Sequence, residues 1–153
     1  MPTAPPVSDL SDHLGYWLRA VSNHVSHAFA RRLAAKGVTV AEWAVMRTLH
    51  GREPMPPSRL AERMGLSRGA VTKLADRLIG KALLARTPDA EDGRMHALAL
   101  TPEGAALVPE LARLADRNDG EAFAALSAAE RGSLEQMLKR LAAAARITAV
   151  PLD

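Results

Sequence analysis

The sequence contains no cysteine among its 153 residues. Disulfide scaffolds, cysteine-ligated zinc fingers, thiolate nucleophiles and thiol redox switches are therefore excluded, because each requires a cysteine side chain. The absence does not fix a compartment, but it agrees with the reducing cytoplasm, which we expect as the location of the protein.

Long hydrophobic runs are also missing. No unbroken apolar stretch is longer than Leu141 to Ala145, whereas about 20 apolar residues are needed for a helix that crosses a bilayer. The first ten residues have neither the basic start nor the apolar run of a secretory signal. We therefore expect no membrane partner. The hydrophobic content of 48% is that of a globular chain with a core of its own.

Proline is absent from residues 7 to 53. Over Leu10 to Leu33, apolar residues recur three or four positions apart, which predicts one long amphipathic helix. A second helix is expected after a cap at Thr39, with its end near Gly51.

Net charge is only +3, but the positive charge is concentrated in the middle of the chain. The segment from Ser58 to Arg86 has seven Lys and Arg residues against two acidic ones, a net charge of +5. Such a segment is a candidate phosphate-binding surface. The alternative is that these side chains are the solvated faces of ordinary amphipathic helices.

The same basic segment has the spacing of a helix-turn-helix. Ala61 is small enough for close helix packing, Gly65 tolerates a turn with positive φ, and Val71 and Leu74 provide the inner face of a second helix that begins near Ser67. Short helix pairs with a glycine turn are common, so this spacing alone leaves an ordinary structural pair open. After it, Leu98 and Leu100 alternate with alanines, which predicts a small hairpin and completes a winged helix.

Two further helices are predicted after the hairpin. Thr101 and Pro102 provide a cap and a first turn, and Pro109 is expected to kink this helix or to delay its true start. The last helix begins with the capping box from Ser127 to Glu130. A small winged helix has no evident place to bury the apolar side chains of the terminal helices, so we expect a homodimer that buries them across a two-fold axis. These side chains are Leu10, Leu14, Leu134, Leu138 and Leu141.

The segment from Leu60 to Gly104 resembles the MarR (multiple antibiotic resistance regulator) family of winged-helix transcription factors. The resemblance rests on the wing pattern Asp92-Gly93-Arg94, on Leu100-Thr101 and on Gly104, all in the family's register. It implies a mainly α fold with a small β-hairpin wing, that is, a winged helix-turn-helix flanked by N- and C-terminal dimerisation helices. The expected units are an N-terminal dimerisation helix (8–36), the DNA-binding domain (39–101) and C-terminal dimerisation helices (102–147).

Helix geometry and the resemblance together predict DNA-binding side chains. We expect Arg68 and Lys73 to contact base edges in a major groove, because they lie opposite the buried stripe of the second helix. Arg94 is expected to enter a minor groove, with Asp92 holding the shape of the wing. The complete predicted set is Ser67, Arg68, Thr72, Lys73, Arg77 and Arg94.

Two features depart from the family pattern. Lys81 is followed by Ala82 where the family usually has glycine, so the turn into the wing must use Gly80 or tolerate alanine. The wing is unusually acidic over residues 89–92, and these charges oppose the contact of Arg94 with phosphates.

The resemblance also implies an effector. Members of the family commonly lose DNA affinity when a small aromatic or phenolic ligand binds between the dimerisation helices and the winged helix. The alternative for the tryptophans is a core position, which we favour for Trp43. The side chains that would line this cleft are Tyr16, Trp17, His24, Trp43, Met46 and Arg47.

We expect neither a metal site nor catalysis. His24 and His27 are three residues apart, but no third ligand completes a zinc site. The sequence has no phosphate-binding glycine loop and no nucleophile elbow, and no cofactor is indicated. The sequence therefore predicts a homodimeric, sequence-specific DNA-binding transcriptional regulator, a repressor released by an aromatic ligand, acting on a near-palindromic double-stranded operator. The alternative is a winged helix used for protein contacts without sequence-specific DNA binding.

Overall fold

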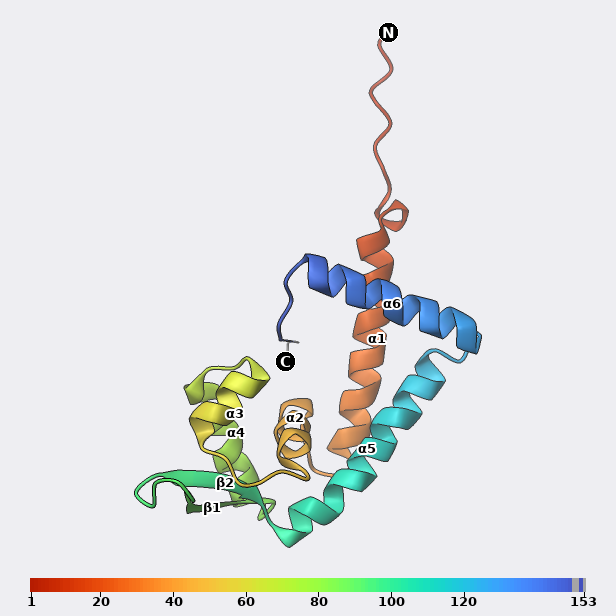
Figure 1. Ribbon diagram of the computed structural model, residues 1–153. Coiled ribbons are helices and arrows are strands. Elements are labelled where there is room, and N and C mark those ends of the chain that lie inside the picture. Colours follow the sequence, from red (N-terminus) through yellow and green to blue (C-terminus); the bar gives the residue numbers. More distant parts are fainter. Residues whose placement is uncertain (150–151, 153) are drawn as a thin grey trace.

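The structure is a computed structural model that describes residues 1–149 and Leu152. Figure 1 shows a winged-helix unit made of α2, α3, α4 and the β1–β2 hairpin, next to the long helices α1, α5 and α6. In chain order the elements are the 3-10 helix η1 (Leu10–Asp12), α1 (Leu14–Ala34), α2 (Val40–Leu49), α3 (Pro57–Met64), α4 (Arg68–Gly80), β1 (Leu84–Pro88), β2 (His96–Leu100), α5 (Pro102–Ala122) and α6 (Ala128–Ala144).

The helices begin at polar caps that the sequence marks. The hydroxyls of Thr39, Ser67, Thr101 and Ser127 each accept a hydrogen bond from the backbone N–H three residues further on. These bonds satisfy N–H groups that have no partner inside the helix, and each stabilises its helix by about 1 kcal/mol. The predicted starts of α2, α4, α5 and α6 are confirmed.

The N-terminal helix is shorter than the sequence predicts. The single helix expected from Leu10 is broken, because η1 ends in an extended residue, His13, and α1 starts only after it. The carboxylate of Asp12 accepts the N–H of Asp9 at 2.9 Å, which closes η1 as a separate short turn. The spacing of apolar residues does not predict this break, because it carries no information on a short acidic side chain that competes with the helix for a backbone N–H group.

The core lies between the winged-helix unit and the adjoining ends of α1 and α5. The hairpin closes it, with Leu84 opposite Leu100 in antiparallel register. Met55, before α3, forms a further bridge with Leu98, through bonds of 2.8 and 3.2 Å. Completely buried large side chains include Leu33, Met46, Leu60, Val71, Leu78, Leu84, Leu98, Val108 and Leu111.

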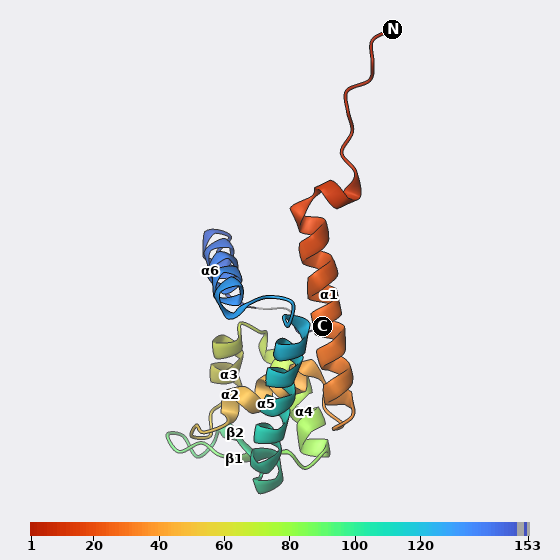
Figure 2. The ribbon, with the colours of Figure 1, turned by 90° about the vertical axis from the view of Figure 1, so that its right-hand side faces the viewer.

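Helices α1 and α5 lie side by side, and α6 turns sharply away from the axis of α5 (Figures 1 and 2). An ion pair joins Arg32 to Glu121, and the buried Asn118 donates a side-chain hydrogen bond of 3.1 Å to the backbone oxygen of Val25. The expectation that Pro109 delays the start of α5 is wrong. Pro109 lies on the exposed side of the helix, where water can satisfy the carbonyl group that it leaves unbonded.

Candidate nucleic-acid interface

The helix pair α3–α4 presents one face of α4 to solvent. Gly65 ends α3 with φ of 68°, a left-handed conformation that glycine adopts without strain, and this sets the angle at which α4 leaves the turn. Val71, Leu74 and Leu78 bury the inner face of α4 in the core. The predicted contacts on the opposite face, Ser67, Arg68, Thr72, Lys73 and Arg77, are all exposed.

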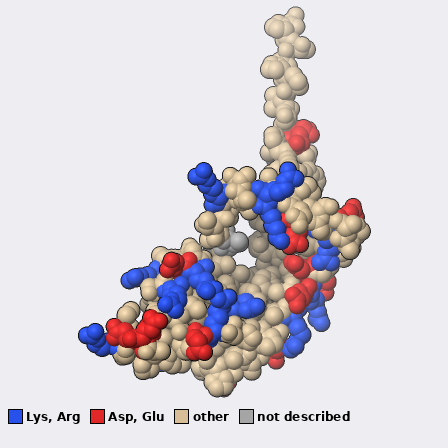
Figure 3. Space-filling view, viewed as in Figure 1, with Lys and Arg blue, Asp and Glu red and all other residues tan. Residues whose placement is uncertain are grey.

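Several charges on this face have no intramolecular partner. Among the residues that the structure describes, no ion pair includes Arg68, Lys73 or Arg77. The one carboxylate of α4, Asp76, pairs with Arg86 of β1. Figure 3 shows several basic side chains on the winged-helix half of the molecule, interspersed with acidic ones, and further basic side chains on the other helices. Basic side chains that are already exposed are available to phosphates and base edges without breaking a protein contact.

The acidic residues of the wing accept hydrogen bonds from backbone N–H groups of the same loop. Asp92 accepts the backbone N–H of Arg94 at 3.0 Å and its Nε at 3.4 Å, and Asp89 accepts the N–H of Glu91 at 3.1 Å. Asp92 therefore pairs with Arg94, whereas Arg86 pairs with Asp76. The side chain of Arg94 remains 93% exposed and extends from the tip of the hairpin.

The turn after α4 tolerates alanine. Ala82 has φ of 60°, so the left-handed position falls on this residue and not on Gly80. Lys81, which precedes it, donates hydrogen bonds to both carboxylate oxygens of Glu42, at 2.7 and 3.0 Å. The sequence reasoning missed Glu42. Its position three residues after Thr39 indicates a capping box, but no sequence signal shows that it also pairs with the end of α4.

The electrostatics of Glu42 follow from these contacts. Burial by itself raises the pKa of a carboxyl group, but hydrogen bonds from Lys81 and Thr39 outweigh it and hold the pKa of Glu42 below its usual value of 4.5. Glu42 is therefore ionised at neutral pH although its side chain is only 1% exposed.

Comparison with known proteins agrees with this geometry. The sequence model of the MarR family matches residues 38–96. A protein of Thauera aromatica, named as a transcriptional regulatory protein for the hcr operon, is 30% identical over 133 residues, which are 86% of this chain and 80% of that protein. The chain belongs to the MarR family.

Other transcriptional regulators resemble it in sequence or fold. The transcriptional repressor MdtR of Bacillus subtilis is 37% identical over 87 residues, 57% of this chain and 56% of MdtR. A variant of MarR from Escherichia coli, solved with operator DNA, has a TM-score of 0.75 and 27% identity, covering 88% of this chain and 99% of that one. PcaV of Streptomyces coelicolor, solved with its natural ligand, has a TM-score of 0.74 and 26% identity, covering 92% and 99%.

The residues predicted to bind an effector in this MarR-family chain are spread over α1 and α2. Tyr16 and Trp17 form an edge-to-face pair on the exposed side of α1, with ring centroids 5.3 Å apart. His24 and Arg47 are exposed, and Trp43 packs partly buried against the core. Met46 is 0% exposed and lies in the core of this chain, beneath the exposed residues of the set.

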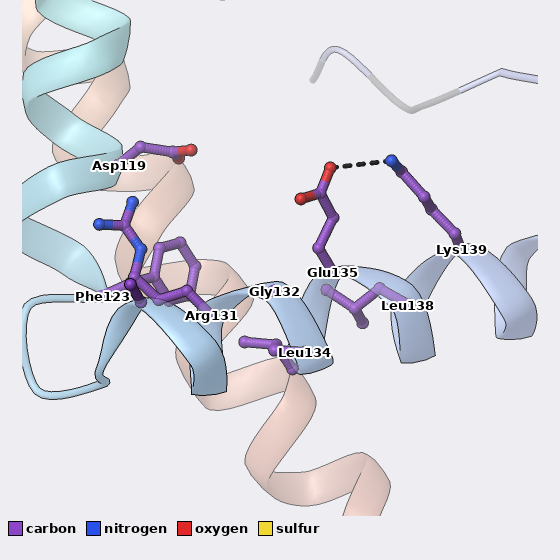
Figure 4. Close-up of a pocket in the computed structure, with 9 residues that line it drawn as sticks. Asp119, Phe123, Arg131, Gly132, Leu134, Glu135, Leu138 and Lys139 are labelled. Atoms are coloured by element: carbon purple, nitrogen blue, oxygen red, sulfur yellow. Dashed lines mark ion pairs between the residues drawn. The ribbon is translucent and has the colours of Figure 1, made fainter.

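Helix α6 borders two hollows on the surface. An apolar groove of about 600 Å³ lies between α1 and α6, and of the predicted effector residues Trp17 alone lines it among the described residues. A second recess of about 580 Å³ lies at the corner of α5 and α6. Figure 4 shows the ion pair of 2.8 Å between Glu135 and Lys139 at this recess, which Phe123 and Leu138 also line.

Neither hollow contains a set of metal ligands. Within the part of the chain that the structure describes, no group of three or more His, Asp or Glu side chains is placed to hold a metal ion. No helix of that part is long and apolar enough to cross a membrane.

Proposed function

We propose that this MarR-family regulator is a homodimer that binds a near-palindromic DNA operator sequence-specifically and represses transcription from it. The observation that carries the proposal is the outer face of α4, which holds Arg68, Lys73 and Arg77 exposed and outside the ion pairs among the described residues. A helix of this kind fits a major groove, which presents a distinct hydrogen-bond pattern for each base pair.

The proposed contacts divide into base reading and anchoring. Arg68 and Lys73 lie in the first half of α4, where a helix inserted in a groove approaches base edges most closely. Ser67, Thr72 and Arg77 are assigned to phosphates, and the exposed Arg94 to the minor groove. MarR of Escherichia coli was solved with operator DNA, which supports DNA over a protein partner for this fold.

The dimer accounts for the groove between α1 and α6. Leu14, Leu18 and Leu141 line it and are each more than half exposed, and no residue of α6 is buried within this fully described helix. A second copy of the chain is the occupant we propose, because its own terminal helices offer a matching apolar surface. A two-fold axis would then place the two α4 helices about 34 Å apart, one turn of DNA.

We further propose that a small aromatic or phenolic effector releases the operator. Support comes from relatives: MdtR is named a repressor, and PcaV was solved with its natural ligand. In this chain the region to test contains the exposed aromatic pair Tyr16 and Trp17, together with His24, Trp43 and Arg47. The buried Met46 would support these side chains from the core without lining the surface.

The experiment is a selection of bound sequences from a random duplex library, followed by competition binding. We expect enrichment of a near-palindrome and a preference of at least about 10³-fold over random duplex at physiological salt. Equal binding to all duplexes, or none at all, would favour the protein-interaction alternative.

The effector is tested on the complex of protein and selected operator. A panel of benzoates and phenols should contain compounds that release the DNA, while cyclohexane carboxylates of equal charge serve as the matched control. Tyr16→Leu, at a residue of the aromatic pair that does not line the groove between α1 and α6, should reduce release without changing operator affinity. Release by the saturated analogues to the same extent would contradict an aromatic site.

A further inference from the structure

The turn that follows α4, residues 81–83, is held by polar contacts from two sides. On one side, the Nζ of Lys81 donates to the backbone oxygen of Gly37 at 2.8 Å and to Glu42 Oε2 at 2.7 Å and Oε1 at 3.0 Å. Among the described residues, the acceptors of this ammonium group therefore lie in the α1–α2 turn and in the first turn of α2.

The carboxylate that receives Lys81 is itself fixed. Glu42 Oε1 also accepts the backbone N–H of Thr39 at 3.2 Å, while the Thr39 hydroxyl accepts the N–H of Glu42 at 3.1 Å. The side chain of Glu42 is 1% exposed, whereas that of Lys81 is 40% exposed. A buried acceptor with both oxygens in use defines one position for the ammonium group, and hence for the end of α4.

On the other side, the start of α5 holds the same turn. The Thr101 hydroxyl donates to the backbone oxygen of Ala82 at 2.7 Å, and the Thr101 N–H donates to Leu83 at 3.1 Å. Gly104 packs so closely on the carbonyl of Leu83 that a Cβ there would overlap it. The C-terminal end of α4 is thus attached to the start of α5, which continues into the α5–α6 corner, and to the turn that follows α1.

We propose that the Lys81–Glu42 pair is a positioning device for DNA recognition, which fixes the end of α4 relative to α2 and the turn that follows α1 and thereby sets the spacing of half-sites that the dimer accepts. This inference rests on the proposed function, because it assumes a dimer that reads two half-sites. In it, Lys81 acts through Glu42 and does not touch DNA. Loss of the pair frees α4 to rotate, so affinity for the correctly spaced operator falls and the penalty for wrong spacing shrinks.

The competing role for Lys81 is a direct phosphate contact. The two roles differ in what happens when Glu42 is neutralised. Glu42→Gln keeps Oε1, which accepts the Thr39 N–H, so the capping box survives. It replaces Oε2, the nearer acceptor of Lys81, with an NH2 group that only donates, and it removes the negative charge, so the hold on the Lys81 ammonium is weakened. A phosphate-binding Lys81 would then bind DNA as well as before or better, whereas a positioning Lys81 loses its fixed acceptor.

The variants are E42Q, K81M, the double variant E42Q/K81M and the control K81R, in the full-length protein. Each is measured by competition binding to the selected operator and to versions with one base pair inserted or removed between the half-sites. We expect E42Q and K81M each to weaken binding to the correct operator by about 3- to 10-fold and to reduce the penalty for wrong spacing. K81R keeps a donor within reach of Glu42 and should remain near the parent. The slope of affinity against salt should be unchanged in all of them.

Thermal unfolding separates positioning from stability. K81M leaves an unpaired buried carboxylate and should lower the melting temperature, and E42Q/K81M should recover it because no buried charge remains. The double variant should still accept wrong spacings. Recovery of both stability and spacing preference in the double variant would overturn the inference, as would a lowered salt slope in K81M with normal binding by E42Q. A parent protein without any spacing preference would instead contradict the proposed function.

Discussion

The winged-helix unit and the terminal helices are built from similar local signals but differ in how they bury their apolar faces. In the winged-helix unit, α4 buries Val71, Leu74, Ala75 and Leu78 within one chain. In the terminal part, α6 begins at a complete capping box, whereas α4 has only a Ser67 cap, yet none of the residues of this fully described α6 is buried. Local hydrogen bonds begin a helix, but the burial of its apolar face decides whether it is stable.

The same difference separates the two ends of α1. Leu33, at its C-terminal end, is completely buried against the winged-helix unit, whereas Leu14, Leu18 and Val21 remain exposed toward the groove. The chain alone therefore completes one core and leaves a second one open. An open apolar surface of this kind is stable in water only when another surface covers it.

Deletion of residues 127–153 tests most directly whether the apolar surface of the terminal helices needs a partner. We expect the truncated protein to aggregate or unfold, because the proposed dimer interface loses α6 and the apolar face of α1 is left uncovered. Size-exclusion chromatography with light scattering and circular dichroism would measure this. A soluble, folded monomer would show that the terminal part needs no partner.

A pair of glycine substitutions compares the packing of the two regions. Gly104→Ala should destabilise the protein by about 3 kcal/mol, because its Cβ would overlap the backbone of Leu83, which cannot move without displacing the turn after α4. Gly132→Ala, in α6, meets nothing within 4 Å and should stabilise its helix by about 0.5 to 1 kcal/mol. Chemical denaturation of both variants measures the difference. Equal effects would contradict the contrast between a closed and an open core.

Substitutions on α4 test the winged-helix unit, in which the exposed residues are expected to bind DNA. Arg68→Ala should relax preference at particular operator positions by about 1 to 3 kcal/mol, while Arg77→Ala should weaken operator and random duplexes alike. Competition against a panel of single-base operator variants at one salt concentration provides the measurement. The reverse pattern would mean that α4 lies in the groove with a different tilt.

Arg94→Ala should have the smallest effect. We expect a several-fold loss of operator affinity and a lower salt dependence, since about two fewer counterions are released per dimer. The fold should be unchanged, because the backbone N–H of residue 94 still donates to Asp92. An unchanged salt slope combined with a lower melting temperature would make Arg94 a structural partner of Asp92 and not a DNA contact.

Much of the fold was predictable because it depends on neighbours in sequence. Thr39, Ser67 and Thr101 cap their helices wherever those helices pack, and Gly65 provides a left-handed turn that few other residues adopt without strain. The break at His13 was missed, because it arises from a hydrogen bond between Asp9 and Asp12 that competes with a continuous helix.

The candidate site also has features that the sequence predicted and features that it did not. That Arg68, Lys73 and Arg77 face solvent follows from helical periodicity and the buried stripe opposite them, so the sequence alone determined it. Only the tertiary structure shows that Asp76 pairs with Arg86, that Lys81 pairs with a buried Glu42 and that Met46 lies inside the core. These contacts join residues 10 or more positions apart, and their energies depend on a burial that exists only once the helices have packed.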